Sequence, residues 1–242
     1  MTAKEHYEQH LGKVYAWMCG EFSLKQREQQ EVLESWGIQP SINGLALDLG
    51  CGHGLQSVSL ARLGFQVVAV DFSTRLLDEL RSRTGHMPIE VVEDDMLLFL
   101  QRFDRKAEVI SCMGDTLTHL ENHSALERFI AETKRHLLQN GKLLISFRDL
   151  SSDVDGLSRF IPVKSDSDKI LTCFLEYFPG HVMVHDILHC RENGRWIQSV
   201  SAYPKLRLSE AALIKLLQSN DLNVEANKCI AGMNYLMAVK TA

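Results

Sequence analysis

The sequence lacks several features that mark whole classes of protein. Its six cysteines are scattered and no two form a C-x-x-C pair, so a cysteine-bound zinc ion is not expected. No apolar run approaches the roughly 20 residues of a membrane span, and residues 1–9 hold no apolar targeting core. We therefore expect a soluble, cytoplasmic protein with reduced cysteines, no membrane partner and no bound metal.

Clustered positive charge is absent as well. The chain carries 26 Lys and Arg against 31 Asp and Glu, a formal net charge of −5. Binding to a nucleic-acid backbone requires grouped basic side chains, so a nucleic acid is not an expected partner. The remaining composition, 45% hydrophobic and 24% charged over 242 residues, is ordinary for a globular protein and suits one α/β domain.

Apolar segments alternate in period between residues 41 and 150. Short strand-like runs fall at 45–49, 66–70, 89–92, 107–111 and 142–147, and helix-like stretches at 55–63, 74–83, 96–103 and 121–138. Strand and helix in regular alternation predict a mostly parallel sheet with helices on both faces. Residues 1–40 have helical spacing and are expected to form a helical cap in front of this core.

The second part of the chain has a different pattern. Strand-like segments at 170–178, 182–190 and 195–203 are separated by Pro179-Gly180 and Asn193-Gly194, which are typical of tight turns. They predict an inserted, three-stranded antiparallel meander within residues 165–205. A helix at 209–218 and strands at 223–230 and 234–240 follow, so residues 206–242 are expected to complete the sheet of a single domain spanning 1–242.

The first strand runs into a glycine-rich loop, Asp48-Leu-Gly50-Cys-Gly52-His-Gly54. Ligands of open parallel sheets bind beyond the carboxyl ends of the strands, where glycines let the backbone approach closely. The spacing differs from the dinucleotide pattern G-x-G-x-x-G, and Asp48 would repel a pyrophosphate. A carboxylate at position 48 suits S-adenosylmethionine (AdoMet), which carries an ammonium and a sulfonium but no phosphate. Asp71 ends the second strand, where an acid can accept hydrogen bonds from ribose hydroxyls.

Five segments resemble, in order and spacing, the motifs of class I AdoMet-dependent methyltransferases: 47–54, 67–71, 94–96, 109–120 and 141–147. The resemblance implies a Rossmann-like, mostly parallel seven-stranded sheet with an antiparallel C-terminal hairpin. The residues expected to bind the cofactor are Asp48, Gly50, Cys51, Gly52, Gly54, Asp71, Phe72, Ser73, Asp95, Met96, Met113 and Gly114. Asp94 competes with Asp95 for the same role, and Phe72 has plain core packing as its alternative.

A looser resemblance links 114–120 and Tyr15-Ala-Trp-Met18 to glycine and sarcosine N-methyltransferases, in which an N-terminal aromatic segment folds over the cofactor. We predict His119 as the first and Tyr15 as the second candidate for a catalytic base, with Trp17 and Arg148 contacting the acceptor. A salt bridge to Asp149 or Asp115 is the alternative for Arg148. The side chain of His53 is expected to be incidental.

The predicted activity is methyl transfer from AdoMet, by in-line displacement, to a small-molecule acceptor, with an amine favoured. The alternatives are an O- or C-methyltransferase of a small metabolite, a non-catalytic AdoMet-binding protein and, below these, an NAD-dependent dehydrogenase. Met113-Gly-Asp-Thr116 stands where many nucleic-acid amino and glutamine methylases of this fold have an Asn-Pro-Pro-Tyr-like tetrapeptide. A homodimer is one expected oligomeric state.

Overall fold

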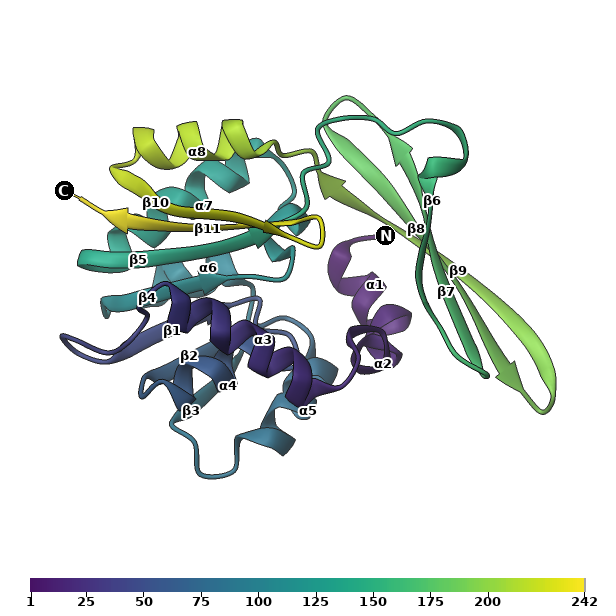
Figure 1. Cartoon of the computed structure of the whole chain (residues 1–242), viewed down its shortest axis with the longest axis horizontal. Helices are drawn as coiled ribbons and strands as arrows, with labels where there is room; N and C mark the ends of the chain where they lie inside the picture. The colour runs from purple at the N-terminus through teal and green to yellow at the C-terminus, as the bar shows by residue number, and fades with distance from the viewer. Residues whose placement is uncertain (242) are drawn as a thin grey trace.

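The computed structural model describes residues 1–241 and contains a large mixed sheet with seven strands in the order β10-β11-β5-β4-β1-β2-β3 (Figure 1). The strands are β1 (Leu45–Leu49), β2 (Gln66–Asp71), β3 (Ile89–Glu93), β4 (Ala107–Cys112), β5 (Leu137–Phe147), β10 (Leu222–Ile230) and β11 (Met233–Lys240). Strands β1 to β5 pair in parallel, whereas β11 runs antiparallel to both β5 and β10. The predicted Rossmann-like sheet with its antiparallel hairpin is confirmed.

Helices cover both faces of this sheet because its central strands are apolar on both sides. Leu45, Leu47 and Leu49 of β1 belong to a core that includes residues of α6, α7 and α8. Ala46 faces the opposite way, into a second core shared with α3, α4 and α5. The helices are α3 (Phe22–Ser35), α4 (Leu55–Arg62), α5 (Thr74–Thr84), α6 (Met96–Arg102), α7 (His123–His136) and α8 (Glu210–Ser219). None of the helices within residues 1–241 is long and apolar enough to cross a membrane.

One predicted boundary is wrong. The helix expected over 121–138 ends at His136, and β5 begins at Leu137, five residues before the predicted strand. Asn140, a turn-like residue, lies inside β5 with a φ of 61°. The pairing of β4 with β5 shifts register between Ala107 and Val109, so the strand absorbs its turn-like residues as an irregularity instead of ending there.

The predicted meander has four strands instead of three. Its order is β6-β7-β8-β9, all antiparallel, with β6 (Phe160–Ser165), β7 (Lys169–Tyr177), β8 (His181–Glu192) and β9 (Arg195–Leu206). The added strand β6 contains Pro162 and shifts register just after it. Proline is tolerated on an edge strand, where one side needs no partner, and this explains why the pattern did not predict a strand.

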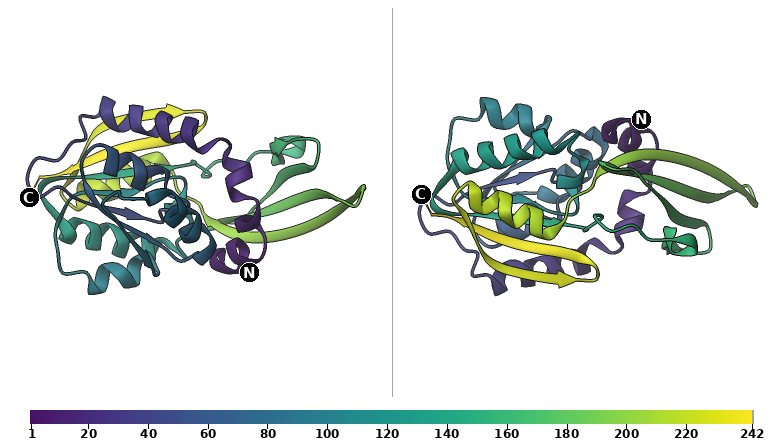
Figure 2. Two further views of the ribbon diagram at one scale, coloured as in Figure 1. Left: turned by 90° about the horizontal axis from the view of Figure 1, so that it is seen from below. Right: turned by 90° about the horizontal axis from the view of Figure 1, so that it is seen from above.

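The N-terminal segment lies between the two sheets (Figure 1). Its short helices are α1 (Ala3–Gln9), the 3-10 turn η1 (Leu11–Lys13) and α2 (Tyr15–Cys19). Leu11 and Val14 pack with Leu171 of β7 and Leu188 of β8. Figure 2 shows the four-stranded sheet projecting from the body that holds the larger sheet, with the N-terminal helices against its base.

Candidate active site

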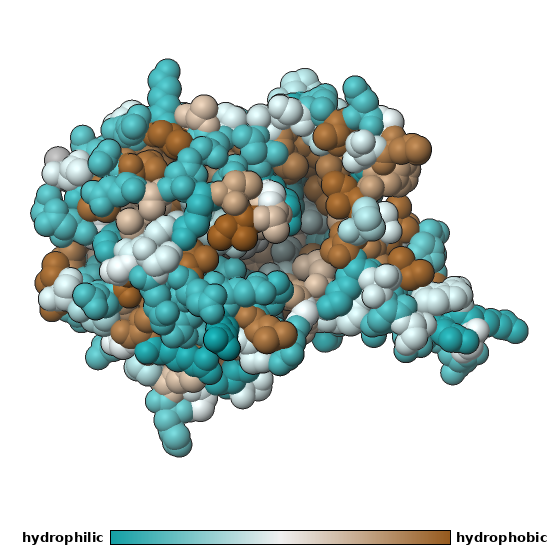
Figure 3. Space-filling view, viewed as in Figure 1, coloured by the Kyte–Doolittle hydropathy of each residue, from teal (hydrophilic) through white to brown (hydrophobic). Residues whose placement is uncertain are grey.

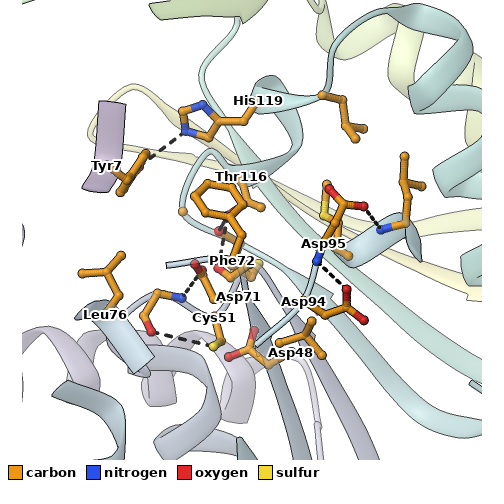
Figure 4. Close-up of a pocket in the computed structure, with 18 of the residues that line it drawn as sticks. Tyr7, Asp48, Cys51, Asp71, Phe72, Leu76, Asp94, Asp95, Thr116 and His119 are labelled. Atoms are coloured by element: carbon orange, nitrogen blue, oxygen red, sulfur yellow. Dashed lines mark hydrogen bonds between the residues drawn. The ribbon is translucent and has the colours of Figure 1, made fainter. Parts of the chain in front are cut away.

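A cavity of about 290 Å³ lies at the carboxyl ends of β1 to β4. Parallel strands bring the loops that follow them to one edge of the sheet, and residues far apart in sequence therefore meet there (Figure 4). Helices α1 and α2 add Tyr7 and Tyr15. Of the residues predicted from the sequence, Asp48, Gly50, Cys51, Gly52, Asp71, Phe72, Asp95, Met96, Met113, Gly114, Tyr15 and His119 line this cavity.

The glycine loop needs its glycines for backbone shape and for space. Gly50 has a φ of 70°, a region that side chains rarely adopt, and a Cβ there would lie 2.1 Å from Cγ2 of Thr116. At Gly52, with a φ of 53°, an added Cβ would lie 3.7 Å from the hydroxyl of Tyr15. The loop therefore packs tightly against the β4 loop at Gly50, while Gly52 faces the N-terminal aromatic residues.

Asp48 is a buried carboxylate at the floor of the cavity, with 1% of its surface exposed. Its two oxygens accept hydrogen bonds from Oγ of Ser57 at 2.5 Å and Oγ of Ser111 at 2.6 Å. Burial raises the pKa of Asp48 to about 6, although both serine hydroxyls oppose the rise. No Lys, Arg or His within residues 1–241 forms an ion pair with it. A cationic ligand would supply the positive countercharge that this carboxylate does not receive from the described residues.

Asp71 ties the glycine loop to the second strand. Its carboxylate accepts hydrogen bonds from the backbone N–H of Gly52 and of Ser73, each at 2.8 Å. Burial raises the pKa of this group as well. A carboxylate has about four lone-pair sites, so Asp71 retains capacity to accept from ligand hydroxyls.

The neighbouring acids after β3 serve two structural roles. Oδ1 of Asp95 accepts from the backbone N–H of Leu97 at 2.9 Å and of Leu98 at 3.1 Å and so caps α6. Asp94 forms an ion pair with Arg102. Both acids also line the cavity, together with Met96 and Leu97. The alternatives left open between Asp94 and Asp95 therefore both lie at the site.

Neutral rings enclose the other end of the cavity. The hydroxyl of Tyr7 lies 3.5 Å from Nε2 of His119, and its ring meets those of His119 and Phe72 edge to face. Burial, followed by the charge of Lys205, lowers the pKa of His119 to about 3. Burial raises the pKa of Tyr7 and of Tyr15 well above the ordinary value. We call Tyr7, Tyr15, Phe72 and His119 the aromatic end of the cavity.

Four predicted residues are not brought to the cavity lining. Ser73 is buried and caps α5 through Leu76, and Gly54 packs against Leu80. Trp17 turns toward the four-stranded sheet, where its Nε1 donates to Asp166 at 2.5 Å.

Arg148 is exposed and points its guanidinium at the carbonyls of Ala231 and Gly232, at 3.4 and 3.5 Å. The antiparallel pairing of β11 with β5 places that turn beside the end of β5, so the side chain has backbone partners away from the cavity. Neither expected acidic partner takes it, since Asp115 pairs with Lys205 instead.

Two more lining residues lie near the glycine loop: Gln56, which the sequence did not indicate, and His53, whose side chain was expected to be incidental. His53 is 2% exposed, lines the cavity and packs edge to face against Tyr15 and Phe22. Burial lowers its pKa to about 4, with Arg83 adding to the effect. Its Nε2, like Oε1 of Gln56, is buried without a hydrogen-bond partner in the part of the chain that the structure describes. Placement in the glycine loop was the one signal pointing to His53.

Tyr7 and Thr116 were also missed. Thr116 follows β4 and fills the space beside Gly50, where its hydroxyl donates to the carbonyl of Met113 at 2.8 Å. Tyr7 comes from α1, which no sequence signal ties to the parallel sheet. A general rule that N-terminal aromatic residues cover this site would have included Tyr7 beside Tyr15.

Comparison with known proteins identifies the core. Residues 46–141 match the family model described as a methyltransferase domain. Over 106 residues, 43% of this chain, it is 37% identical to a cypemycin N-terminal methyltransferase from a Streptomyces species. It is 30% identical over 101 residues, 39% of this chain, to a ubiquinone biosynthesis O-methyltransferase from Proteus mirabilis. These matches span 41% of the length of each of these curated relatives.

Solved structures share the fold along nearly the whole chain. The CcbJ methyltransferase from Streptomyces caelestis superposes with a TM-score of 0.75 at 18% identity, covering 98% of both chains. The AdoMet-bound CalS10, an amino pentose methyltransferase from Micromonospora echinaspora, gives 0.73 at 12% identity, covering 96% of this chain and 97% of CalS10.

The residues present fit the cofactor of these proteins. A buried carboxylate without a protein cation, a second carboxylate with lone pairs to spare and an enclosing set of neutral rings suit a cationic nucleoside. Residues 46–141 are similar to a methyltransferase domain, and the whole chain has the fold of S-adenosylmethionine-dependent methyltransferases, a likeness that supports S-adenosylmethionine as the cofactor.

Proposed function

We propose that this protein transfers the methyl group of AdoMet to a nitrogen atom of a small-molecule amine. The observation that carries the proposal is the aromatic end of the cavity, where no group is suited to remove a proton near neutral pH. His119 has a pKa of about 3, and the pKa values of Tyr7 and Tyr15 are raised by burial. An efficient general base has a pKa near the working pH.

His119 and Tyr15 would therefore position the acceptor instead of acting as the catalytic bases expected from the sequence. As a neutral ring held near Tyr7, His119 accepts or donates a hydrogen bond and orients an acceptor, but it does not store a proton. An amine that reaches the site as the free base needs no base from the protein. A phenol or an alcohol has a weakly nucleophilic neutral form and depends on such a base.

The bound cofactor supplies a methyl group on a sulfonium centre, which is electrophilic and has a good leaving group. The chain supplies position and an environment free of water. Asp48 and Asp71 would hold the amino-acid and ribose parts, and the rings of Tyr7, Tyr15 and Phe72 would exclude water from the reacting end. Electron-rich ring faces also favour the positive charge that develops on an attacking amine nitrogen. Holding the two reactants in line can contribute several kcal/mol to the rate.

The named relatives support methyl transfer to small molecules and leave the acceptor atom open. They include N-methyltransferases, such as a glycine/sarcosine N-methyltransferase from Halorhodospira halochloris, and ubiquinone biosynthesis O-methyltransferases. The choice of nitrogen therefore rests on the aromatic end of the cavity.

The test is to measure S-adenosylhomocysteine (AdoHcy) formed from AdoMet in the presence of size-matched amines, phenols or carboxylates over pH 6–10. We expect turnover of amines, with kcat/KM rising with the fraction of the acceptor present as free base. Preferred turnover of phenols, with an enzyme group titrating near pH 7, would contradict the choice of nitrogen. AdoHcy binding without turnover of any acceptor class would favour a non-catalytic binder.

A further inference from the structure

A second cavity of about 520 Å³ borders the first. It lies between the segment 119–123, which leads into α7, and the adjoining ends of β8 and β9, with the first residues of the chain at its edge. His119, Leu120 and Glu121 line both cavities. Figure 3 shows the molecule hollowed between the body of the larger sheet and the four-stranded sheet, with hydrophobic residues on the side of the latter. We call this second cavity the outer groove.

The first cavity has little room for a second molecule. Its volume of about 290 Å³ is near the lower limit for a small-ligand site, roughly 300–1,000 Å³. The side chains of Tyr7 and Tyr15 close this cavity at its aromatic end. An acceptor therefore needs a neighbouring space that reaches the same end, and the outer groove meets it at His119.

The outer groove has a one-sided charge pattern. Among the described residues that line it, Glu121 is the one side chain with a fixed charge. The end of β9 and the residue after it supply no free cation, because Lys205 is paired with Asp115 and the Arg207 guanidinium with Asp153. The guanidinium of Arg148 points at the 231–232 turn. Arg128 lines the first cavity but not the outer groove. An acceptor carboxylate would meet the like charge of Glu121, and no Lys or Arg side chain among the described residues lines the groove to pair with it.

The walls of the outer groove are mixed in polarity. Met183 and Pro204 are directly paired across β8 and β9, and His181 is paired with Leu206 in the same way. Three apolar side chains and one imidazole therefore form the wall that β8 and β9 contribute. A volume of about 520 Å³ exceeds the needs of a single small amino acid and suits a larger body with both apolar and polar groups.

We propose that the outer groove binds the body of the acceptor, and that this acceptor is an amine larger than glycine that carries no carboxylate. The inference rests on the proposed methyl transfer to nitrogen and names the class of amine. It departs from the looser resemblance to glycine and sarcosine N-methyltransferases, whose named acceptors are amino acids. The amine would extend past His119 toward the cofactor, while the body lies along β8 and β9.

Matched acceptor pairs test the charge argument. 2-Phenylethylamine and phenylalanine, or tyramine and tyrosine, differ by one carboxylate, and glycine and sarcosine serve as small references. We expect kcat/KM to be at least about tenfold higher for the member without the carboxylate, corresponding to about 1.4 kcal/mol. The Glu121→Arg variant should narrow or reverse that preference. Equal or better use of phenylalanine, tyrosine or glycine by the wild-type chain overturns the inference.

A filling substitution tests the location. Met183→Trp should raise the acceptor KM at least about tenfold, whereas AdoHcy affinity measured by calorimetry should stay unchanged. Ile187→Trp is the matched control, because residue 187 lies on the same face of β8 but outside the groove lining. An unchanged KM in Met183→Trp, or AdoHcy binding with no amine of the panel turned over, counts against the inference. Failure of the wild-type chain to bind AdoHcy would instead refute the proposed function itself.

Discussion

The hydroxyl of Tyr7 lies 3.5 Å from Nε2 of His119, which joins the N-terminal helix α1 to the loop that follows β4. These residues are 112 positions apart in the chain, and neither belongs to the parallel sheet that holds the cofactor motifs. Their contact completes the aromatic end of the cavity. The N-terminal segment is therefore part of the site and not only a cover for it.

Removing the Tyr7 hydroxyl should impair the reaction more than cofactor binding. We expect Tyr7→Phe to lower kcat/KM by about tenfold, or about 1.4 kcal/mol of transition-state stabilisation, because His119 loses the group that orients it. AdoHcy affinity should change by less than about threefold. His119→Gln, which retains a hydrogen-bonding amide, should keep more activity than His119→Ala. A kcat profile that loses a titration near pH 7 in His119→Gln would instead show that His119 acts as a base.

Asp48 should give the protein a distinctive pH dependence. Burial raises the pKa of this acid from 3.8 to about 6, so the folded state binds the proton more tightly than the unfolded state. Between pH 4 and 6 the unfolded chain therefore loses its proton first, and the contribution of Asp48 to stability decreases as the pH rises. The loss amounts to about 3 kcal/mol at most.

The Asp48→Asn variant isolates this effect. The difference in free energy of unfolding, variant minus wild type, should increase by up to about 3 kcal/mol between pH 4 and pH 7. Urea denaturation of the ligand-free proteins measures it. At pH 7 its AdoHcy affinity should be at least about tenfold weaker, since it lacks the charge that faces the amino-acid ammonium. Equal AdoHcy affinity in both proteins would remove Asp48 from the set of cofactor ligands.

His53 should behave as a group that is left unpaired until a ligand binds. Its Nε2 has no hydrogen-bond partner within residues 1–241, and an unpaired buried polar atom costs about 1–3 kcal/mol. His53→Phe keeps the ring contacts with Tyr15 and Phe22. We expect the free variant to melt at a higher temperature than wild type but to gain less stability from AdoHcy.

Methylthioadenosine has the adenosine and sulfur of AdoHcy without the amino-acid tail, so it tests whether His53 contacts that tail. Its affinity should be the same for His53→Phe and wild type. Equal loss of affinity for both nucleosides would mean that the substitution distorts the glycine loop. No loss for either would return His53 to a packing role.

The N-terminal helix should depend on one buried histidine–aspartate contact. Nε2 of His6 lies 3.0 Å from Oδ2 of Asp186, and Nδ1 lies 2.7 Å from Oγ of Ser201. Both members of the pair are at most 2% exposed. His6→Ala leaves the carboxylate buried without this partner, which typically costs about 3–5 kcal/mol. We expect faster hydrogen exchange over residues 1–19 and weaker AdoHcy binding.

Lys4→Ala, on the exposed side of the same helix, is the control for His6 and should change neither measurement. The double variant His6→Phe with Asp186→Leu should regain stability, because an apolar pair of similar volume can replace a buried ion pair. If His6→Ala left exchange over residues 1–19 as slow as in wild type, the pair would not be what holds α1.

The sequence alone determined the parallel core and predicted S-adenosylmethionine as its ligand. The alternation of strands and helices between residues 41 and 150 reflects local periodicity, which short-range sterics and burial impose directly. The loop after β1 was readable because its glycines adopt positive φ and because Asp48 stands two residues before the first of them. Each of these signals lies within one segment of about ten residues.

Only the tertiary structure decided which side chains complete the site. Tyr7 reaches it because the pairing of His6 with Asp186 holds α1 against the four-stranded sheet, and that pair spans 180 residues. Arg148 leaves it because β11 enters antiparallel and places carbonyls beside the guanidinium. Strand β6 forms because β7 offers it an edge, despite Pro162. Contacts between distant segments decided each case, and local propensity carries no information about them.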